Sequence, residues 1–155
     1  MTDQSFPPIP FRPRPRDWEG FPMPSSVPDG LRLELSRARV RDGKEGEFEE
    51  WMSTLNERYP EMQEGLPAER QVFEATFRST EADGSTWIYH LSLMGTDGGG
   101  NDESIPIDAL HVDYSRRVKE PGWEELEPKL MLTPDHLRAA MIQWGRTGST
   151  AQSAE

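Results

Sequence analysis

The chain has 155 residues, of which 34% are hydrophobic, enough for one domain with a single modest core. It contains no Cys, which excludes disulfides, thiolate nucleophiles, iron–sulfur clusters and Cys-based zinc sites. A net charge of −11 argues against binding nucleic acid or an anionic membrane surface. Because it also lacks a long apolar run and a secretory signal, we expect a soluble cytoplasmic protein.

Residues 1–30 are rich in proline and are expected to form an extended arm. Proline removes backbone donors and disfavours helix in the residue before it. The segment also carries four aromatic side chains, more than a solvated tail needs: Phe6, Phe11, Trp18 and Phe21. Two interpretations stay open, a disordered tail and an arm that lies on its own domain or on a partner subunit. The small polar residues 146–155 predict a disordered C-terminal tail.

The folded domain is expected to span residues 31–145 and to begin with a strand and a helix. Leucines at every second position from residue 31 to 35 predict the strand. The apolar positions 38 and 40 change parity, which predicts a bulge near Arg37. Apolar residues then recur every three or four positions from Phe48 to Met62, which predicts a helix over residues 44–65. Pro60 should kink or interrupt its last turn.

The rest of the domain is predicted to contain a hairpin, a second helix, a fourth strand and a last helix. Residues 71–78 and 86–94 predict a β-hairpin with a polar turn at 82–85. A glycine-rich loop precedes a second helix between Ile107 and Val118. Leucines at 126, 130 and 132 mark a fourth strand. Thr133-Pro134-Asp135 then has the pattern of a helix start, and Gly145 that of a helix end.

The resulting order, β-α-β-β-α-β with an extra C-terminal helix, predicts an α+β protein with the ferredoxin-like fold. In that fold a four-stranded antiparallel sheet carries both helices on one face. The odd-numbered strand positions, including Phe73, Phe77 and Leu91, are apolar and are expected to pack under the helices. The other face needs a cover, and the same sheet of a second copy would provide it. We therefore expect a homodimer.

Several segments resemble the dimeric α/β-barrel superfamily, namely ELSRARV at 34–40, GKE at 43–45 and EWM at 50–52. That superfamily includes cofactor-independent antibiotic-biosynthesis monooxygenases, polyketide cyclases, haem-degrading enzymes and mutarotases. FEATFR at 73–78 and IDALHVDY at 107–114 are similar to a small member family that is a domain of unknown function. The resemblance covers roughly residues 31–145. It implies a dimeric α/β barrel, and the similar family has no settled activity to carry over.

Histidines and nearby carboxylates are the candidate acid/base groups. His111 lies on the apolar stripe of the second helix, either as a packed core residue or as a general base that Asp108, one turn earlier, orients. His90 and Glu74 fall on the even-numbered face of the hairpin. They form either a cross-strand ion pair at the dimer interface or a reserve acid/base pair.

Further candidates would hold the substrate. Arg37 and Tyr89 would stabilise negative charge on a substrate oxygen, although Arg37 also fits a solvated strand end. The remaining candidates are aromatic or polar side chains, each of which core packing or surface pairing would also explain. They are Trp51, Trp87, Tyr114, Arg39, Arg78 and Ser36. No metal-ligand spacing and no phosphate-binding loop is present, so we expect neither a metal nor a cofactor.

The sequence favours an enzyme that acts on an apolar, aromatic or polyketide-like small molecule by acid/base chemistry. Cyclisation, isomerisation and cofactor-free oxygenation are the candidate reactions, and the resemblance implies them more than the residues do. The alternative is a non-catalytic ligand-binding or accessory protein of the same fold. Haem binding is a third interpretation, which needs an axial histidine in an open pocket.

Overall fold

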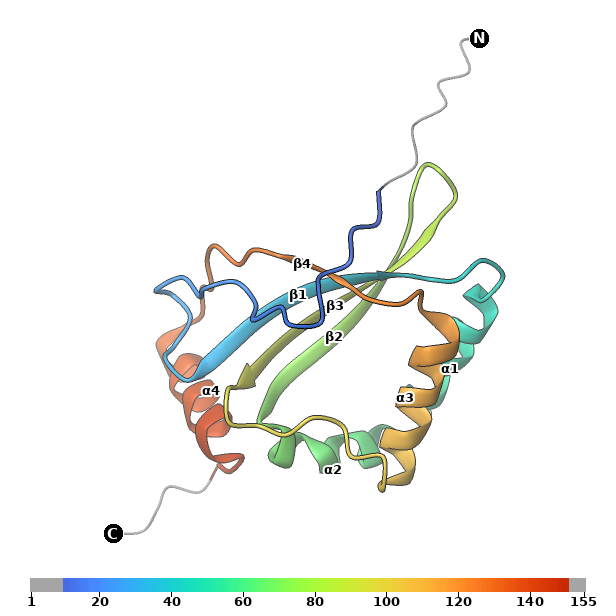
Figure 1. Ribbon diagram of the computed structural model, residues 1–155. Helices are drawn as coiled ribbons and strands as arrows, with labels where there is room; N and C mark the ends of the chain where they lie inside the picture. Colours follow the sequence, from blue (N-terminus) through green and yellow to red (C-terminus); the bar gives the residue numbers. More distant parts are fainter. Residues whose placement is uncertain (1–9, 151–155) are drawn as a thin grey trace.

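The computed structural model describes residues 10–150, and its elements follow the predicted order. They are β1 (Leu31–Arg39), α1 (Glu45–Glu57), α2 (Tyr59–Glu69), β2 (Gln71–Thr80), β3 (Thr86–Gly95), α3 (Pro106–Val118), β4 (Glu124–Leu126) and α4 (Asp135–Thr147). The strands pair antiparallel in the order β2-β3-β1-β4 (Figure 1). This open four-stranded sheet confirms the predicted α+β, ferredoxin-like arrangement. Within the described residues, no helix combines the length and the apolar character that a membrane crossing needs.

Strand register divides the side chains between two faces of the sheet. His90 pairs with Ser36 on one side and with Thr76 on the other, so even-numbered residues of β1, β2 and β3 share a face. We call this the even face, and β4 adds Glu125 to it because Glu125 pairs with Ser36. The opposite, odd face carries Leu33, Leu35, Arg37, Phe77, Trp87, Tyr89 and Leu91.

Helices α1 and α3 cover the even face, so the prediction that the odd face lies under the helices is wrong. Ile88 of the even face packs with Phe48 and Trp51 of α1 and with Val118 of α3 in one buried cluster. On the odd face, Phe77 is 55% exposed. The helices are anchored by a few apolar side chains at one end of the sheet. The polar middle of the even face is therefore left beside a cavity instead of in the core.

Strand β1 buries opposite faces at its two ends, which explains the change of parity in its sequence. Leu31 packs with Leu93 and with Met141 of α4 on the odd face. Ala38 is buried on the even face near the α1–α3 cluster. The register with β3 is continuous from Leu31 to Arg39, so the bulge expected near Arg37 is absent. The register shift lies in β2 instead, just after Gln71.

Other element boundaries differ from the sequence predictions. The helix expected over residues 44–65 is two helices, and Pro60 lies in the first turn of α2, where proline needs no hydrogen bond. Strand β4 ends at Leu126, and the later leucines of the expected strand, Leu130 and Leu132, are exposed. Pro128 follows that end and cannot donate to a sheet ladder.

The last helix also runs further than predicted. Thr133 does not cap it, since the N-cap residue is Pro134 and no side chain makes a capping hydrogen bond. Helix α4 continues past Gly145 to Thr147, so the folded part extends into the segment predicted as a tail. It ends at Gly148, whose φ of 66° lies in the left-handed region that glycine tolerates. Residues 151–155 of that segment, and Phe6 of the arm, lie outside the described residues.

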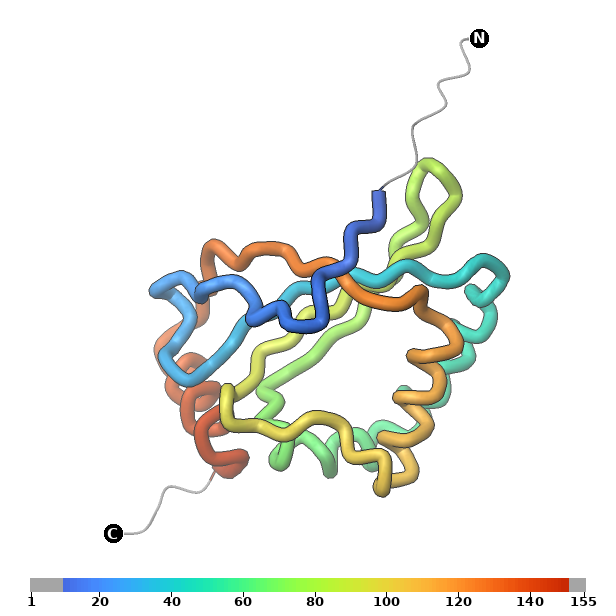
Figure 2. Tube along the Cα trace, in the orientation of Figure 1, coloured from blue at the N-terminus to red at the C-terminus, as the bar shows by residue number. Residues whose placement is uncertain are grey.

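The proline-rich arm lies against its own domain from residue 10 onward (Figure 2). The backbone N–H of Arg14 donates to the carbonyl of Trp123, 2.8 Å away, beside β4. Phe11 packs edge-on against Trp87 of the odd face, with 5.5 Å between ring centroids. Trp18 instead reaches Glu125, which belongs to the even face. The arm therefore wraps around the β4 edge of the sheet.

Candidate functional site

A cleft lies between the even face and the helices, in two adjoining parts. The inner chamber has a volume of about 190 Å³, and the outer chamber about 750 Å³. Both are lined by Ser36, Ile88, His90 and Lys119, so they adjoin each other at these side chains. The cleft therefore lies over the polar middle of the even face, beside the apolar cluster that anchors the helices.

The arm forms one wall of the outer chamber. Trp18, Glu19 and Gly20 line it on one side, and the end of α3 with the following loop lines it on the other. The loop contributes Trp123, which is 38% exposed. The outer chamber is thus enclosed between the sheet, α3 and a segment that precedes the ferredoxin-like domain in the sequence.

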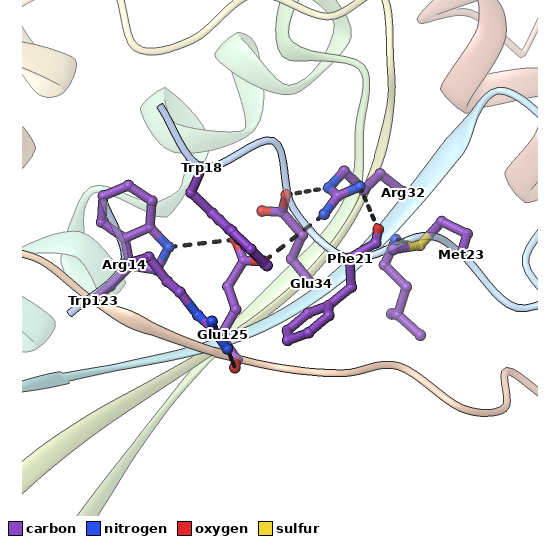
Figure 3. Close-up of polar contacts among 9 residues, drawn as sticks. Arg14, Trp18, Phe21, Met23, Arg32, Glu34, Trp123 and Glu125 are labelled. Carbon is purple, nitrogen blue, oxygen red and sulfur yellow. Dashed lines mark hydrogen bonds and ion pairs between the residues drawn. The ribbon is translucent and has the colours of Figure 1, made fainter. Parts of the chain in front are cut away.

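A set of hydrogen bonds holds this wall in place (Figure 3). The indole N–H groups of Trp18 and Trp123 both donate to the carboxylate of Glu125, at 3.0 Å and 3.3 Å. Arg32 donates to the carbonyl of Phe21 at 3.1 Å. Gly20 has a φ of 87°, and a Cβ at this position would collide with the guanidinium of Arg32. The positive φ therefore favours glycine here, whereas the guanidinium at the flexible end of Arg32 can shift to make room.

The inner chamber collects titratable side chains from four elements. They come from the end of α2, from β2 and β3, and from α3 and the residue that follows it. They are Glu69, Glu74, His90, Asp108, His111 and Lys119. Such a concentration in a partly enclosed space is typical of a functional site, because burial and mutual interaction shift pKa values there.

Glu74 and His90 form an ion pair across β2 and β3. Nε2 of His90 lies 3.3 Å from Oε2 of Glu74, and each side chain is about one-third exposed. The hydrogen bond from His90 is the main reason why the pKa of Glu74 is lowered. The carboxylate therefore stays ionised and holds one ring nitrogen. The other nitrogen, Nδ1, has no hydrogen-bond partner among residues 10–150.

His111 has a defined tautomer. Nε1 of Trp51 lies 3.1 Å from Nδ1 of His111, and an indole N–H can only donate. Nδ1 is therefore the acceptor, and Nε2 carries the proton. Burial lowers the pKa of His111, which keeps the ring neutral at neutral pH. This geometry makes His111 a hydrogen-bond donor into the chamber.

Asp108 does not orient His111 in the way that the sequence suggested. The carboxylate of Asp108 is buried and accepts the backbone N–H of Asp102 at 2.9 Å, which holds the loop before α3. The hydrogen bond that fixes the His111 ring comes from Trp51 of α1. Sequence separation hides this contact, because it depends on how α1 packs against α3.

Glu69 is a functional candidate that the sequence reasoning missed. Burial raises its pKa to about 7, and the negative charges of Glu74 and Asp108 add to the shift. Its position in the sequence, at the polar end of an amphipathic helix, resembles that of any surface glutamate. At neutral pH this carboxyl group can both give and take a proton.

We expect the Glu69→Gln variant to be more stable than the wild-type protein at pH 8 but not at pH 5. The folded-state pKa of Glu69 is raised above its ordinary value of 4.5, so the native state holds this proton more tightly than the unfolded state. The favourable contribution of protonated Glu69 to the free energy of unfolding is fully present below pH 4.5. It is lost as the pH rises through 7. Thermal melts at both pH values measure the effect, with Glu64→Gln on the exposed side of α2 as the control. An equal Tm difference at both pH values would contradict the assignment.

Lys119 is a second group that the sequence reasoning missed. It follows α3 and forms an isolated antiparallel bridge with Val40, so its side chain points inward as that of Val40 does. Its Nζ lies 5.5 Å from the centroid of the Trp51 ring. Burial lowers its pKa. In the sequence it is simply a lysine at the end of a helix, which gives no signal of burial.

Several predicted site residues lie away from the cleft on the odd face. Arg37 forms an ion pair with Glu124 at 2.6 Å and lies 3.5 Å from the hydroxyl of Tyr89. Arg39 and Arg37 both lie over the Trp87 ring. The sheet separates all of these side chains from His111. They cannot act with it on one ligand within a protomer.

Two other predicted residues are on the helix side of the sheet but outside both chambers. Tyr114 stacks on Trp51, with the rings 6.2 Å apart and nearly parallel. Arg78 pairs with Glu49 of α1 at 2.6 Å on the surface. The predicted residues that do line the cleft are Ser36, Trp51, Glu74, His90, Asp108 and His111. No group of three or more metal-ligating side chains occurs among the described residues.

Comparison with known families gives a match that covers both the sheet and the inner chamber. Residues 31–139 match the model of DUF6176, a family of unknown function. The protein belongs to the DUF6176 family. The match includes all four strands, helices α1 to α3 and every titratable residue of the inner chamber, but not the arm. No curated protein and no solved structure gives a significant match. A functional assignment for this DUF6176 protein therefore depends on the geometry of the cleft.

Proposed function

We propose that this DUF6176 protein is a small-molecule enzyme that moves a proton at a carbon next to a carbonyl group. The observation that carries the proposal is the inner chamber, which brings together the Glu74–His90 pair, the carboxyl group of Glu69 and the neutral donor His111. A base, an acid and a donor for developing negative charge are the three parts that such a reaction needs.

His90 serves as the base. Its Nε2 proton is held by Glu74, which leaves the lone pair on Nδ1 available to a substrate C–H. When His90 takes the proton, the ring becomes positively charged. The adjacent carboxylate of Glu74 stabilises that charge and keeps the ring in one orientation.

His111 and Glu69 complete the proton path. As the C–H proton leaves, negative charge develops on the carbonyl oxygen, and Nε2–H of His111 can donate to it. A neutral imidazole is suited to this because it donates without adding a positive charge to the chamber. Glu69, with its pKa of about 7, can return a proton to a different atom of the substrate.

This step is common to the reactions considered from the sequence. Isomerisation, aldol-type cyclisation and cofactor-free oxygenation can all begin with an enolate formed next to a carbonyl. The resemblance to the dimeric α/β-barrel superfamily, which contains cyclases and cofactor-independent monooxygenases, supports the proposal. The cleft is lined by polar groups as well as by Trp18, Trp51 and Trp123. We therefore propose a substrate that combines a polar carbonyl end with an apolar or aromatic part.

Hydrogen–deuterium exchange into simple carbonyl compounds tests this function. The full chain is incubated in D2O with 2-oxobutyrate, phenylacetone or 2-tetralone, and NMR follows the loss of the C–H signal next to the carbonyl. We expect exchange with at least one probe to exceed the buffer rate. Probe binding without any exchange would favour the alternative, a non-catalytic ligand-binding protein of the same fold. A protein that neither binds nor exchanges any of the three probes would contradict the proposed substrate class.

We also propose that a second copy of the chain covers the odd face. This face and the chain beyond it expose Phe73, Phe77, Leu126, Leu130 and Leu132, an apolar surface that water would otherwise meet. Sedimentation should show a dimer, and the Phe77→Glu variant should shift it toward the monomer. Tyr59→Glu is the matched control, because Tyr59 on α2 is equally exposed, at 57% against 55%. A wild-type protein that sediments as a monomer would overturn this proposal.

A further inference from the structure

Lys119 differs from the other two lysines of the chain. Lys44 and Lys129 each form an ion pair at 2.7 Å, with Glu47 and Glu127 respectively. Within residues 10–150, no carboxylate lies within ion-pair distance of Lys119, although its side chain is half-buried. An ammonium group in that position is neither fully solvated nor paired with a carboxylate, so its charged form is disfavoured.

The backbone on both sides of Lys119 is fixed to the end of β1. The N–H of Arg41 donates to the carbonyl of Val118, and the N–H of Glu120 donates to that of Arg39, both at 2.8 Å. These two bonds flank the bridge between Lys119 and Val40. The side chain is therefore directed into the cleft by the backbone and not by an ion pair. Its amine lies by the Trp51 ring, where the two chambers meet.

The surroundings of Lys119 favour the neutral amine. Burial lowers its pKa, and His111 lines the same inner chamber. His90 and Ser36 of the even face line the same junction. Groups that can move protons to and from the amine are therefore within the same chamber.

We propose that Lys119 binds the carbonyl group of the ligand covalently, as a Schiff base at the junction of the two chambers. The neutral Nζ attacks the carbonyl carbon, the C=O π bond breaks, and one amine proton passes to the oxygen to give a carbinolamine. Loss of water, made of the carbonyl oxygen and the two hydrogens of the amine, leaves a C=N bond. The protonated nitrogen then takes the place of the carbonyl oxygen as the acceptor of the electron pair, so His111 has no oxygen to stabilise in this route. The adjacent C–H, the bond that His90 is placed to break, becomes more acidic. The ligand class rests on the proposed function.

Reductive trapping tests the inference directly. The full chain is incubated with 2-oxobutyrate or phenylacetone and sodium cyanoborohydride, which reduces a Schiff base to a stable secondary amine, and peptide mass spectrometry locates the product. We expect Lys119 to be modified at least ten times faster than Lys44 or Lys129. The Lys119→Arg variant, which keeps the charge but has no reactive amine, should lose this fast modification only. Equal rates at the three lysines, or no product at Lys119, would overturn the inference.

Deuterium exchange by the same variant separates this inference from the proposed function. If the wild-type protein exchanges the probes without any trapped product at Lys119, the proton-transfer function stands and the Schiff base is wrong. If Lys119 is trapped but no exchange occurs, the covalent site stands and the proton-transfer function is wrong. If both assignments are right, Lys119→Arg should lower the exchange rate at least tenfold while Lys129→Arg leaves it unchanged.

Discussion

Replacing Glu74 by Gln should lower the rate of probe exchange about 100-fold, within the range that a general base contributes. The amide fills the same space and can still accept a hydrogen bond from His90. It cannot stabilise the positive charge that His90 acquires when it takes a proton. The loss should therefore fall on the rate of the chemical step more than on probe binding. NMR-detected exchange at saturating and at low probe concentration distinguishes the two.

Glu49→Gln provides the control for this experiment. Glu49 lies on α1 and pairs with Arg78 of β2, outside the cleft, so its replacement removes one carboxylate near the same strand without touching the chamber. Its exchange rate should equal that of the wild-type protein. A Glu74→Gln protein that melts normally and exchanges at the full rate would show that His90 is not the base.

Replacing Gly95 by Ala should destabilise the fold by about 3 kcal/mol, the upper part of the range for overpacking a closed core. Gly95 ends β3, where α4 passes directly over it. A Cβ on Gly95 would lie 1.7 Å from the carbonyl oxygen of Gly145. Because the obstacle is backbone, no change of side-chain rotamer can relieve it, and α4 has to move away from the sheet. Urea denaturation followed by tryptophan fluorescence measures the loss.

Gly46 offers a matched substitution with the opposite expectation. It lies in α1, and a Cβ there would meet no atom within 4 Å. Gly46→Ala should therefore stabilise the protein by roughly 0.5 kcal/mol, through the lower entropy of the unfolded chain. If Gly95→Ala were as harmless as Gly46→Ala, the close packing of α4 on β3 would be incorrect.

The sequence predicts the order of elements well because that order depends on local periodicity. It does not predict which face of the sheet the helices cover, because that depends on packing between elements that are far apart in the sequence. The apolar odd positions of the hairpin outnumber the apolar even ones, but α1 and α3 are held by Ile88, Val40 and a few neighbours at one end of the sheet. At the end of the sheet where β1 begins, α4 covers the odd face and packs on Leu31 and Leu93.

The candidate site shows the same division. Strand alternation predicts that Ser36, Glu74 and His90 share a face, and they do. The same rule places the odd-numbered Arg37 and Tyr89 on the other face. Strand alternation alone therefore argues against one site that contains both groups. The Trp51–His111 hydrogen bond and the burial of Lys119 follow from helix packing and a single bridge to β1. No local pattern encodes these contacts.

The outer and inner chambers of the cleft are lined in part by separate stretches of the chain. The groups of the inner chamber all fall within residues 31–139, whereas Trp18, Glu19 and Gly20, which line the outer chamber, precede that region. A relative with a different leading segment could admit a differently shaped molecule while keeping the same inner-chamber residues. Under the proposed function, ligand selectivity would then vary with the sequence of the arm, while the proton-transfer groups stay the same.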